Sequence, residues 1–131
     1  MMRSLARSLR ILALSWLTAL VAHLLFGWAW TPLGGVVAGL NSGTRPFSIA
    51  SLAGGLSWGA LTGYNLAVAP GETVRMLSTM GAIFGGIPGP VVAFATVLIG
   101  ALLGLLGALP ARIARRAWVD TKSNHPTELP A

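Results

Sequence analysis

The feature of this sequence that most constrains its fold is a set of long uncharged apolar stretches with arginines at both ends of the set. Residues 11–30, 47–69 and 90–109 contain no Asp, Glu, Lys or Arg. At about 1.5 Å per residue, a helix of about 20 residues crosses the roughly 30 Å hydrocarbon core of a bilayer. With 54% hydrophobic and only 9% charged residues, the chain is unlike a soluble domain. The sequence therefore predicts an all-α, polytopic membrane helix bundle.

The first stretch, residues 11–30, also resembles the apolar part of a secretory signal. A cleaved signal has a shorter apolar core, followed by a small-residue cleavage site. Here Trp28 and Trp30 stand at the far end instead, where an interfacial aromatic belt is expected. We therefore expect a retained helix.

The basic residues predict the orientation. Most of the nine Lys and Arg residues lie near the two ends of the chain, with Arg45 and Arg75 between them. Because cytoplasmic flanks carry an excess of Lys and Arg, both termini are expected in the cytoplasm, with the chain in the cell membrane. No basic patch interleaved with aromatics is present, so nucleic acid is not expected as a partner.

The flanks divide into three segments. Residues 1–10 are expected to form a basic cytoplasmic N-terminus, and residues 120–131 a polar, disordered tail. Pro110 is expected to end the last span. Residues 110–119 then form a basic interfacial segment whose headgroup-binding side chains are Arg112, Arg115, Arg116 and Trp118.

An even number of spans is needed to return the C-terminal arginines to the cytoplasm, so one further segment should cross. Two shorter apolar pieces, 32–44 and 74–88, are candidates, and charge does not distinguish them because Arg45 and Arg75 simply exchange sides. Tight turns at residues 70–72 and 87–90 favour 74–88 as the fourth span. Residues 32–44 would then be a short re-entrant or interfacial helix.

Glycines recur every four residues along most of these segments. Such a stripe lets helix backbones approach closely, and close van der Waals approach is a main source of helix association in lipid. The stripes predict a tightly packed bundle, in which either all stripes pack within the chain or at least one faces another subunit. The glycines expected to pack are Gly35, Gly39, Gly43, Gly55, Gly59, Gly63, Gly81, Gly85, Gly89, Gly100 and Gly104.

Chemistry-bearing residues are scarce. None of the three acidic residues falls in an expected span, cysteine is absent, and no phosphate-binding glycine loop is present. We therefore expect no catalytic, cofactor or metal site. His23, Asn41 and Asn65 are the candidate functional polar residues within the membrane, although hydrogen bonding within the packed bundle is the favoured role for each of them.

These observations favour a non-enzymatic membrane subunit that packs against itself or a larger complex. Its expected partners are the lipid bilayer and other copies of the chain or other membrane proteins. The alternative is a small oligomeric transporter or channel, in which 32–44 is re-entrant and His23, Asn41 and Asn65 line a path.

Overall fold

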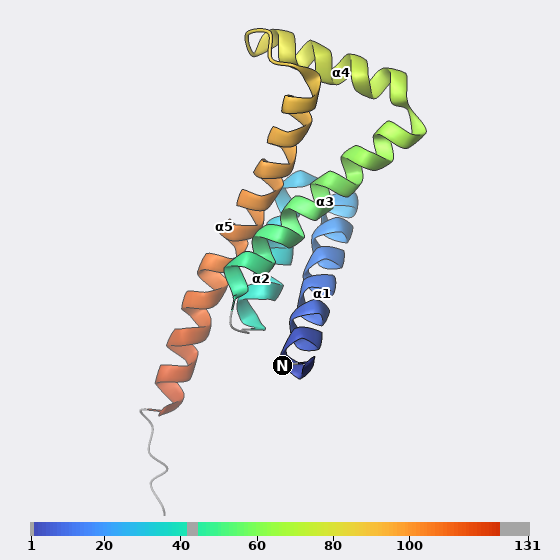
Figure 1. Ribbon diagram of the computed structural model, residues 1–131. Coiled ribbons are helices and arrows are strands. Elements are labelled where there is room, and N and C mark those ends of the chain that lie inside the picture. Colours follow the sequence, from blue (N-terminus) through green and yellow to red (C-terminus); the bar gives the residue numbers. More distant parts are fainter. Residues whose placement is uncertain (1, 42–44, 124–131) are drawn as a thin grey trace, which may run out of the picture.

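The structure is a computed structural model that describes residues 2–41 and 45–123. Within these ranges every regular element is a helix, and no strand is present. The expectation of an all-α chain is therefore confirmed. Helices α1 (Met2–Phe26), α2 (Pro32–Leu40), α3 (Pro46–Val68) and α5 (Gly89–Ser123) form a bundle, and α4 (Pro70–Ile83) lies across one end of it (Figure 1).

Helix α1 (Met2–Phe26) includes the basic N-terminal segment and ends earlier than expected. Gly27 has a φ of 89°, a conformation that side chains other than glycine rarely adopt, and this turns the chain out of the helix. A single 3-10 turn, η1 (Trp28–Trp30), follows. The predicted continuous helix over residues 11–30 is therefore wrong in its last four residues.

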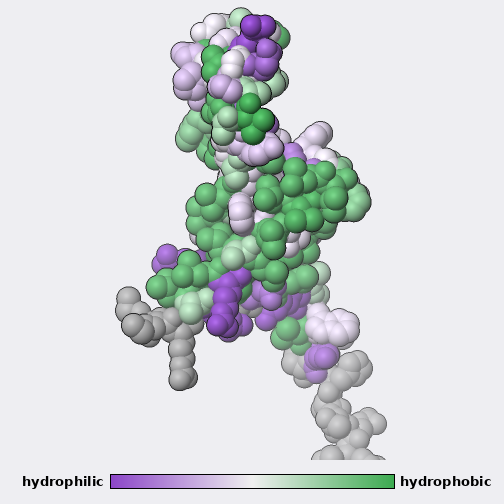
Figure 2. Space-filling view, turned by 90° about the vertical axis from the view of Figure 1, so that its right-hand side faces the viewer, coloured by the Kyte–Doolittle hydropathy of each residue, from purple (hydrophilic) through white to green (hydrophobic). Residues whose placement is uncertain are grey.

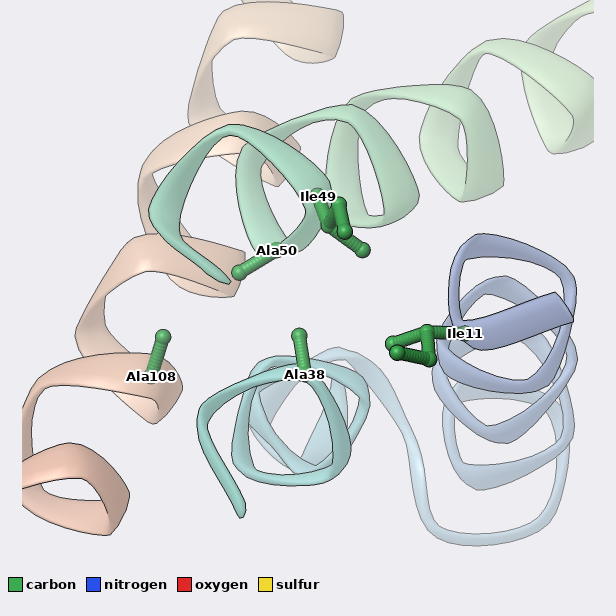
Figure 3. Close-up of a cluster of buried hydrophobic side chains, with 5 residues drawn as sticks. All are labelled: Ile11, Ala38, Ile49, Ala50 and Ala108. Atoms are coloured by element: carbon green, nitrogen blue, oxygen red, sulfur yellow. The ribbon is translucent and has the colours of Figure 1, made fainter. Parts of the chain in front are cut away.

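Helix α2 (Pro32–Leu40) begins with proline at its first position, where the missing N–H costs nothing. It runs back beside α1 and contacts α1, α3 and α5 (Figure 1). The buried core is centred on it: Ala38 lies among side chains from the three neighbouring helices (Figure 3). That cluster comprises Ile11, Ala38, Ile49, Ala50 and Ala108.

Helix α3 (Pro46–Val68) is antiparallel to α5, and this is the most extensive helix contact in the molecule (Figure 1). Proline disfavours helical geometry in the residue before it, so Pro70 ends α3 and opens the next helix. Ala69 accordingly has φ −137° and ψ 65°.

Helix α4 (Pro70–Ile83) has 14 residues, or about 21 Å of helix. It lies across the ends of α3 and α5 rather than along the bundle (Figure 1). Gly85 and Gly86, both with positive φ, turn the chain into α5. Residues 74–88 therefore do not run along the bundle, as was expected of a fourth span, and α2 is the segment that returns the chain along it to the start of α3; the bilayer crossing of 74–88 stays a prediction.

Helix α5 (Gly89–Ser123) is a single helix of 35 residues that continues through Pro110. The helix itself does not stop at Pro110, whereas the expected end of the membrane span there stays a prediction. Proline removes one backbone hydrogen bond but can remain within a long apolar helix where the freed carbonyl finds other partners. Residues 110–119 thus extend α5, as do residues 120–123, and residues 124–131 lie outside the described part of the chain.

Helices α1 and α3 begin at the end of the bundle where α5 ends (Figure 1). Arg45 therefore lies at the same end as Arg10 and Arg112, and we call this the arginine-rich end. Arg75 lies on α4, at the opposite end. Hydrophilic surface gathers at the two ends, with hydrophobic surface between them (Figure 2).

Two helical segments of the described chain, Ser4–Phe26 and Gly89–Lys122, are long and apolar enough to cross a membrane, fewer than the four spans expected. Helix α3 has sufficient length, but its glycines, serines and the Tyr64–Asn65 pair lower its hydropathy. Helices α2 and α4 are too short by this measure.

Candidate functional site

The centre of the bundle is a set of glycine contacts, which we call the glycine seam: Gly35, Gly54, Gly100, Gly104 and Gly107. A Cβ atom added to Gly104 of α5 would fall against the carbonyl oxygen of Ala50 in α3, and one added to Gly35 of α2 would fall against the carbonyl oxygen of Gly104. The backbones of α2, α3 and α5 therefore touch directly. No larger residue fits at these positions without moving a helix.

Gly34 and Gly35, which are adjacent in α2, contact two different helices. Gly34 faces α1, where an added Cβ would lie 2.5 Å from the carbonyl oxygen of Ser15 and 2.6 Å from the Cβ of Ala19, while Gly35 faces α5. The doublet lets α2 lie between both helices. Gly34, Gly54 and Gly107 were not among the glycines expected to pack. A search at a spacing of four misses Gly34 and Gly54 because they lie on another face from the glycine that follows each of them, and it misses Gly107 because this residue follows Gly104 by three.

The remaining glycines expected to pack fall into three groups. Gly39 and Gly81 are tightly packed, the first against Ala108 and Ala111 of α5 and the second against the carbonyl of Ile87 in the turn after α4. A Cβ on Gly55, Gly59 or Gly89 would make only ordinary contacts, at 3.4–3.6 Å from its nearest neighbours. Gly63 and Gly85 have open space around them. Gly43 lies outside the described residues.

Two of the glycines with room for a Cβ border an open apolar groove on the outer side of α3, which we call the α3 groove. Gly55 and Gly59 line it, with Trp16 of α1 and Val97 of α5 on its sides, and its volume is about 550 Å³. The other lining residues are Ser51, Leu52, Leu56, Ala60 and Ala101. The groove thus combines small residues with apolar walls, a combination that admits an apolar chain or helix.

Thr31, between η1 and α2, links three elements and is fully buried. Its Oγ1 accepts a hydrogen bond from Nε1 of Trp58 at 3.3 Å and lies 3.2 Å from Nδ1 of His23. The rings of His23 and Trp58 meet edge to face, with centroids 5.4 Å apart. Because Trp58 donates to Thr31, the hydroxyl proton of Thr31 is free to be donated to His23 Nδ1. The three side chains join α1 and α3 to the start of α2.

The other two candidate polar residues lie elsewhere. Asn41 caps the end of α2 at the arginine-rich end, where its side-chain amide donates to the carbonyl of Val37 at 2.9 Å. Asn65 is exposed in the last turn of α3, about 30 Å along that helix from Arg45. The structure does not bring His23, Asn41 and Asn65 together, so they do not line one path within the chain.

Ser57 lies fully buried between α3 and α1. Its hydroxyl is 2.8 Å from the carbonyl oxygen of Ala53 in its own helix and 3.3 Å from that of Trp16 in α1. This contact fixes Trp16 beside the α3 groove.

The headgroup residues expected at the basic segment lie on the last turns of α5. Arg115, Arg116 and Trp118 are exposed, and the ammonium of Lys122 lies 5.3 Å from the centre of the Trp118 ring. Arg112 differs from them, because it is half-buried and its Nε and Nη1 atoms are enclosed with no hydrogen-bond partner.

Among the residues that the structure describes, no three His, Cys, Asp or Glu side chains gather in a metal-binding arrangement. The geometry instead presents surfaces: the α3 groove, the basic turns of α5 and the polar junction at Thr31. The chain matches no family model, no curated protein sequence and no solved structure.

Proposed function

We propose that this chain is a polytopic membrane protein that works as a packing subunit, associating with further copies of itself through the α3 groove. The first support is the surface of the bundle. Most of the large hydrophobic side chains of α1 and α5 point outward, and only 22% of the most apolar window of either helix is buried. A helix at the core of a soluble protein would be mostly buried. A bilayer provides the missing apolar solvent.

The distribution of basic residues between the two ends of the bundle also fits a bilayer. In the proposed orientation the arginine-rich end faces the cytoplasm, and α1, α2, α3 and α5 run alternately away from it and back. This arrangement places both described chain ends on the cytoplasmic side, in line with the positive-inside bias. Arg75 alone among the described basic residues is on the other side.

Helix α4 supports the same orientation. Thr73, Leu77 and Gly81 form its buried face, while Met80 and Ile83 beside them are exposed and apolar. Its remaining face carries polar residues, among them an exposed Glu72–Arg75 pair at 4.0 Å. A helix lying across the end of the bundle with these two faces suits the boundary between hydrocarbon and headgroups.

The proposed association rests on a difference between two sets of glycines. The glycine seam is filled by the chain's own helices, whereas Gly55 and Gly59 border a groove that the described chain leaves open. Small residues along a helix allow a second helix to approach closely in lipid, where little hydrophobic force acts between helices. The α3 groove is therefore the surface best suited to a neighbouring helix.

The test is Gly59→Leu, with oligomeric mass measured by light scattering in mild detergent. A Cβ at residue 59 would lie 3.6 Å from Val97, an ordinary contact, and the rest of the leucine side chain would occupy the open groove that Gly59 lines. We expect the wild type to have a multiple of the monomer mass and the variant to be monomeric at unchanged thermal stability.

Gly71→Leu is the matched control, since residue 71 lies on α4 with nothing within 4 Å of an added Cβ. It should keep the wild-type mass. If the wild type is monomeric in detergent and in lipid nanodiscs, or if both variants have the wild-type mass, the proposed association through the α3 groove is wrong.

A further inference from the structure

We infer that Arg112 forms a binding site for the phosphate group of an anionic phospholipid, at the arginine-rich end of the contact between α3 and α5. This inference rests on the proposed membrane location. It goes beyond a general attraction of basic residues to lipid, because it assigns one guanidinium, in one place, to one phosphate.

The packing of the core locates the site. Ala50 of α3 and Ala108 of α5 belong to one buried cluster (Figure 3). The two helices are antiparallel, and Gly104 of α5 packs against Ala50 of α3, so Ala108 is level with the start of α3 at Pro46 and Arg112 lies about one turn beyond it. Arg112 therefore lies just beyond the packed core, on the side toward which the N-terminus of α3 points.

The guanidinium of Arg112 lacks an acceptor. Its Nε and Nη1 atoms are enclosed and have no hydrogen-bond partner, although a guanidinium has five N–H groups to donate. Enclosing charged donors without an acceptor is unfavourable. A turn of the end of the side chain would exchange these unpaired groups for two parallel bonds to phosphate oxygens, a geometry that suits the planar fork of arginine.

The start of α3 provides a second set of unpaired donors. Its N-cap residue, Arg45, makes no side-chain capping bond, and the first backbone bond of this helix runs from the N–H of Ile49 to the carbonyl of Arg45. The N–H groups of Phe47 and Ser48 thus face the arginine-rich end without a partner in the helix. A helix N-terminus also carries partial positive charge, which favours an anion.

The charges nearby have the same sign. Arg45, Arg115 and Arg116 lie on the same turns of α3 and α5 or next to them. Of the acidic residues in the described chain, Glu72 is on α4 at the opposite end, and Asp120 lies two turns beyond Arg112, about 12 Å along α5. An anionic ligand would therefore meet attraction from several sides.

The position of Arg112 along α5 indicates that the phosphate belongs to a lipid. The uncharged part of α5 from Val91 to Leu109 has a length of about 28 Å, close to the thickness of one hydrocarbon core. Arg112 follows about one turn later, which is the level of the headgroup phosphates.

The experiment is native mass spectrometry of the full chain, released from detergent in the presence of phosphatidylglycerol or phosphatidylcholine. The spectrum reports the number of bound lipids and the number of copies of the chain together, so that loss of lipid binding and loss of association are seen separately. We expect the wild type to retain phosphatidylglycerol in preference to phosphatidylcholine.

Two variants remove one positive charge each from neighbouring turns. Arg112→Gln should weaken phosphatidylglycerol binding about tenfold, the loss expected for a bidentate charge-assisted pair, whereas Arg116→Gln should weaken it much less. Arg112→Lys, which keeps the charge and removes the fork, should resemble Arg112→Gln. Equal effects of Arg112→Gln and Arg116→Gln, full binding by Arg112→Lys, or no preference for phosphatidylglycerol would each overturn the inference.

Inorganic phosphate distinguishes the source of the ligand. If millimolar phosphate leaves the bound phosphatidylglycerol in place, the lipid is the ligand, as we infer. If phosphate displaces the lipid from the wild type and itself binds in a manner that needs Arg112, the site is a phosphate site without lipid selectivity, and the assignment to phospholipid is overturned.

Discussion

Thr31 is the residue on which two aromatic side chains from different helices converge. Its hydroxyl accepts the indole N–H of Trp58 and lies within hydrogen-bond distance of His23. Thr31→Val keeps the shape of the side chain but leaves both ring nitrogens without this partner. We expect it to lower the free energy of unfolding by about 1–3 kcal/mol.

Thermal unfolding in detergent, followed by circular dichroism, checks this expectation. Thr18→Val is the matched control, because the Thr18 hydroxyl bonds only to the carbonyl of Leu14 in its own helix. Equal midpoints for the two variants would show that the Thr31 junction contributes nothing specific to stability.

Among the individual residues of the Thr31 junction, the sequence indicated only some. His23 stood out because it is an ionisable group within an apolar stretch. Its partner Thr31 did not, because it follows the stretch in a segment expected to connect two elements. Only the chain reversal after Gly27, which depends on a positive φ, brings the two side chains together.

Helix packing explains why identical glycine substitutions should differ in effect. Gly104→Ala places a Cβ against the backbone of α3 and should destabilise the chain by about 1–3 kcal/mol, the usual cost of overpacking. Gly63→Ala adds the same atom where nothing lies within 4 Å. It should leave stability unchanged or raise it by up to about 1 kcal/mol through helix propensity.

Urea unfolding of the two variants in the same detergent measures this difference. A loss of stability in Gly63→Ala as large as that in Gly104→Ala would mean that the glycine seam is not the tight part of the bundle.

Among the elements, the existence of helices was predictable, and their ends were predictable only where a local residue decides them. Pro32, Pro46 and Pro70 each begin a helix at its first position, as proline favours. Pro110 does not end α5, since a proline inside a long apolar helix can be tolerated. Whether proline stops a helix depends on what surrounds the next turn, which the sequence does not state.

For the whole molecule, the main difference from expectation is that α2, and not α4, runs along the bundle. Turn residues near both ends of α4 favoured it as a span, and charge was neutral between the two possibilities. The structure returns the chain through α2, because the Gly34–Gly35 doublet lets this short helix fit between α1 and α5. Whether α2 fits between helices on two sides depends on the tertiary structure. The four-residue spacing of glycines describes only one face of a helix and does not detect such a fit.

The proposed membrane orientation follows from this arrangement. Arg45 shares an end of the bundle with the start of α1 and the end of α5, whereas Arg75 lies at the other end. If the bundle crosses a bilayer, these two residues are on opposite sides, and Arg45 is on the side of both termini.

Single-cysteine labelling measures this directly, because the chain contains no cysteine of its own. Arg45→Cys, Arg75→Cys and Arg7→Cys would each be expressed in intact cells and treated with a membrane-impermeant maleimide before and after permeabilisation. We predict that the cysteine at position 75 is labelled in intact cells, and that those at positions 7 and 45 are labelled only after permeabilisation. Labelling of positions 45 and 75 from the same side, or recovery of the chain in the soluble fraction, would contradict the proposed membrane bundle.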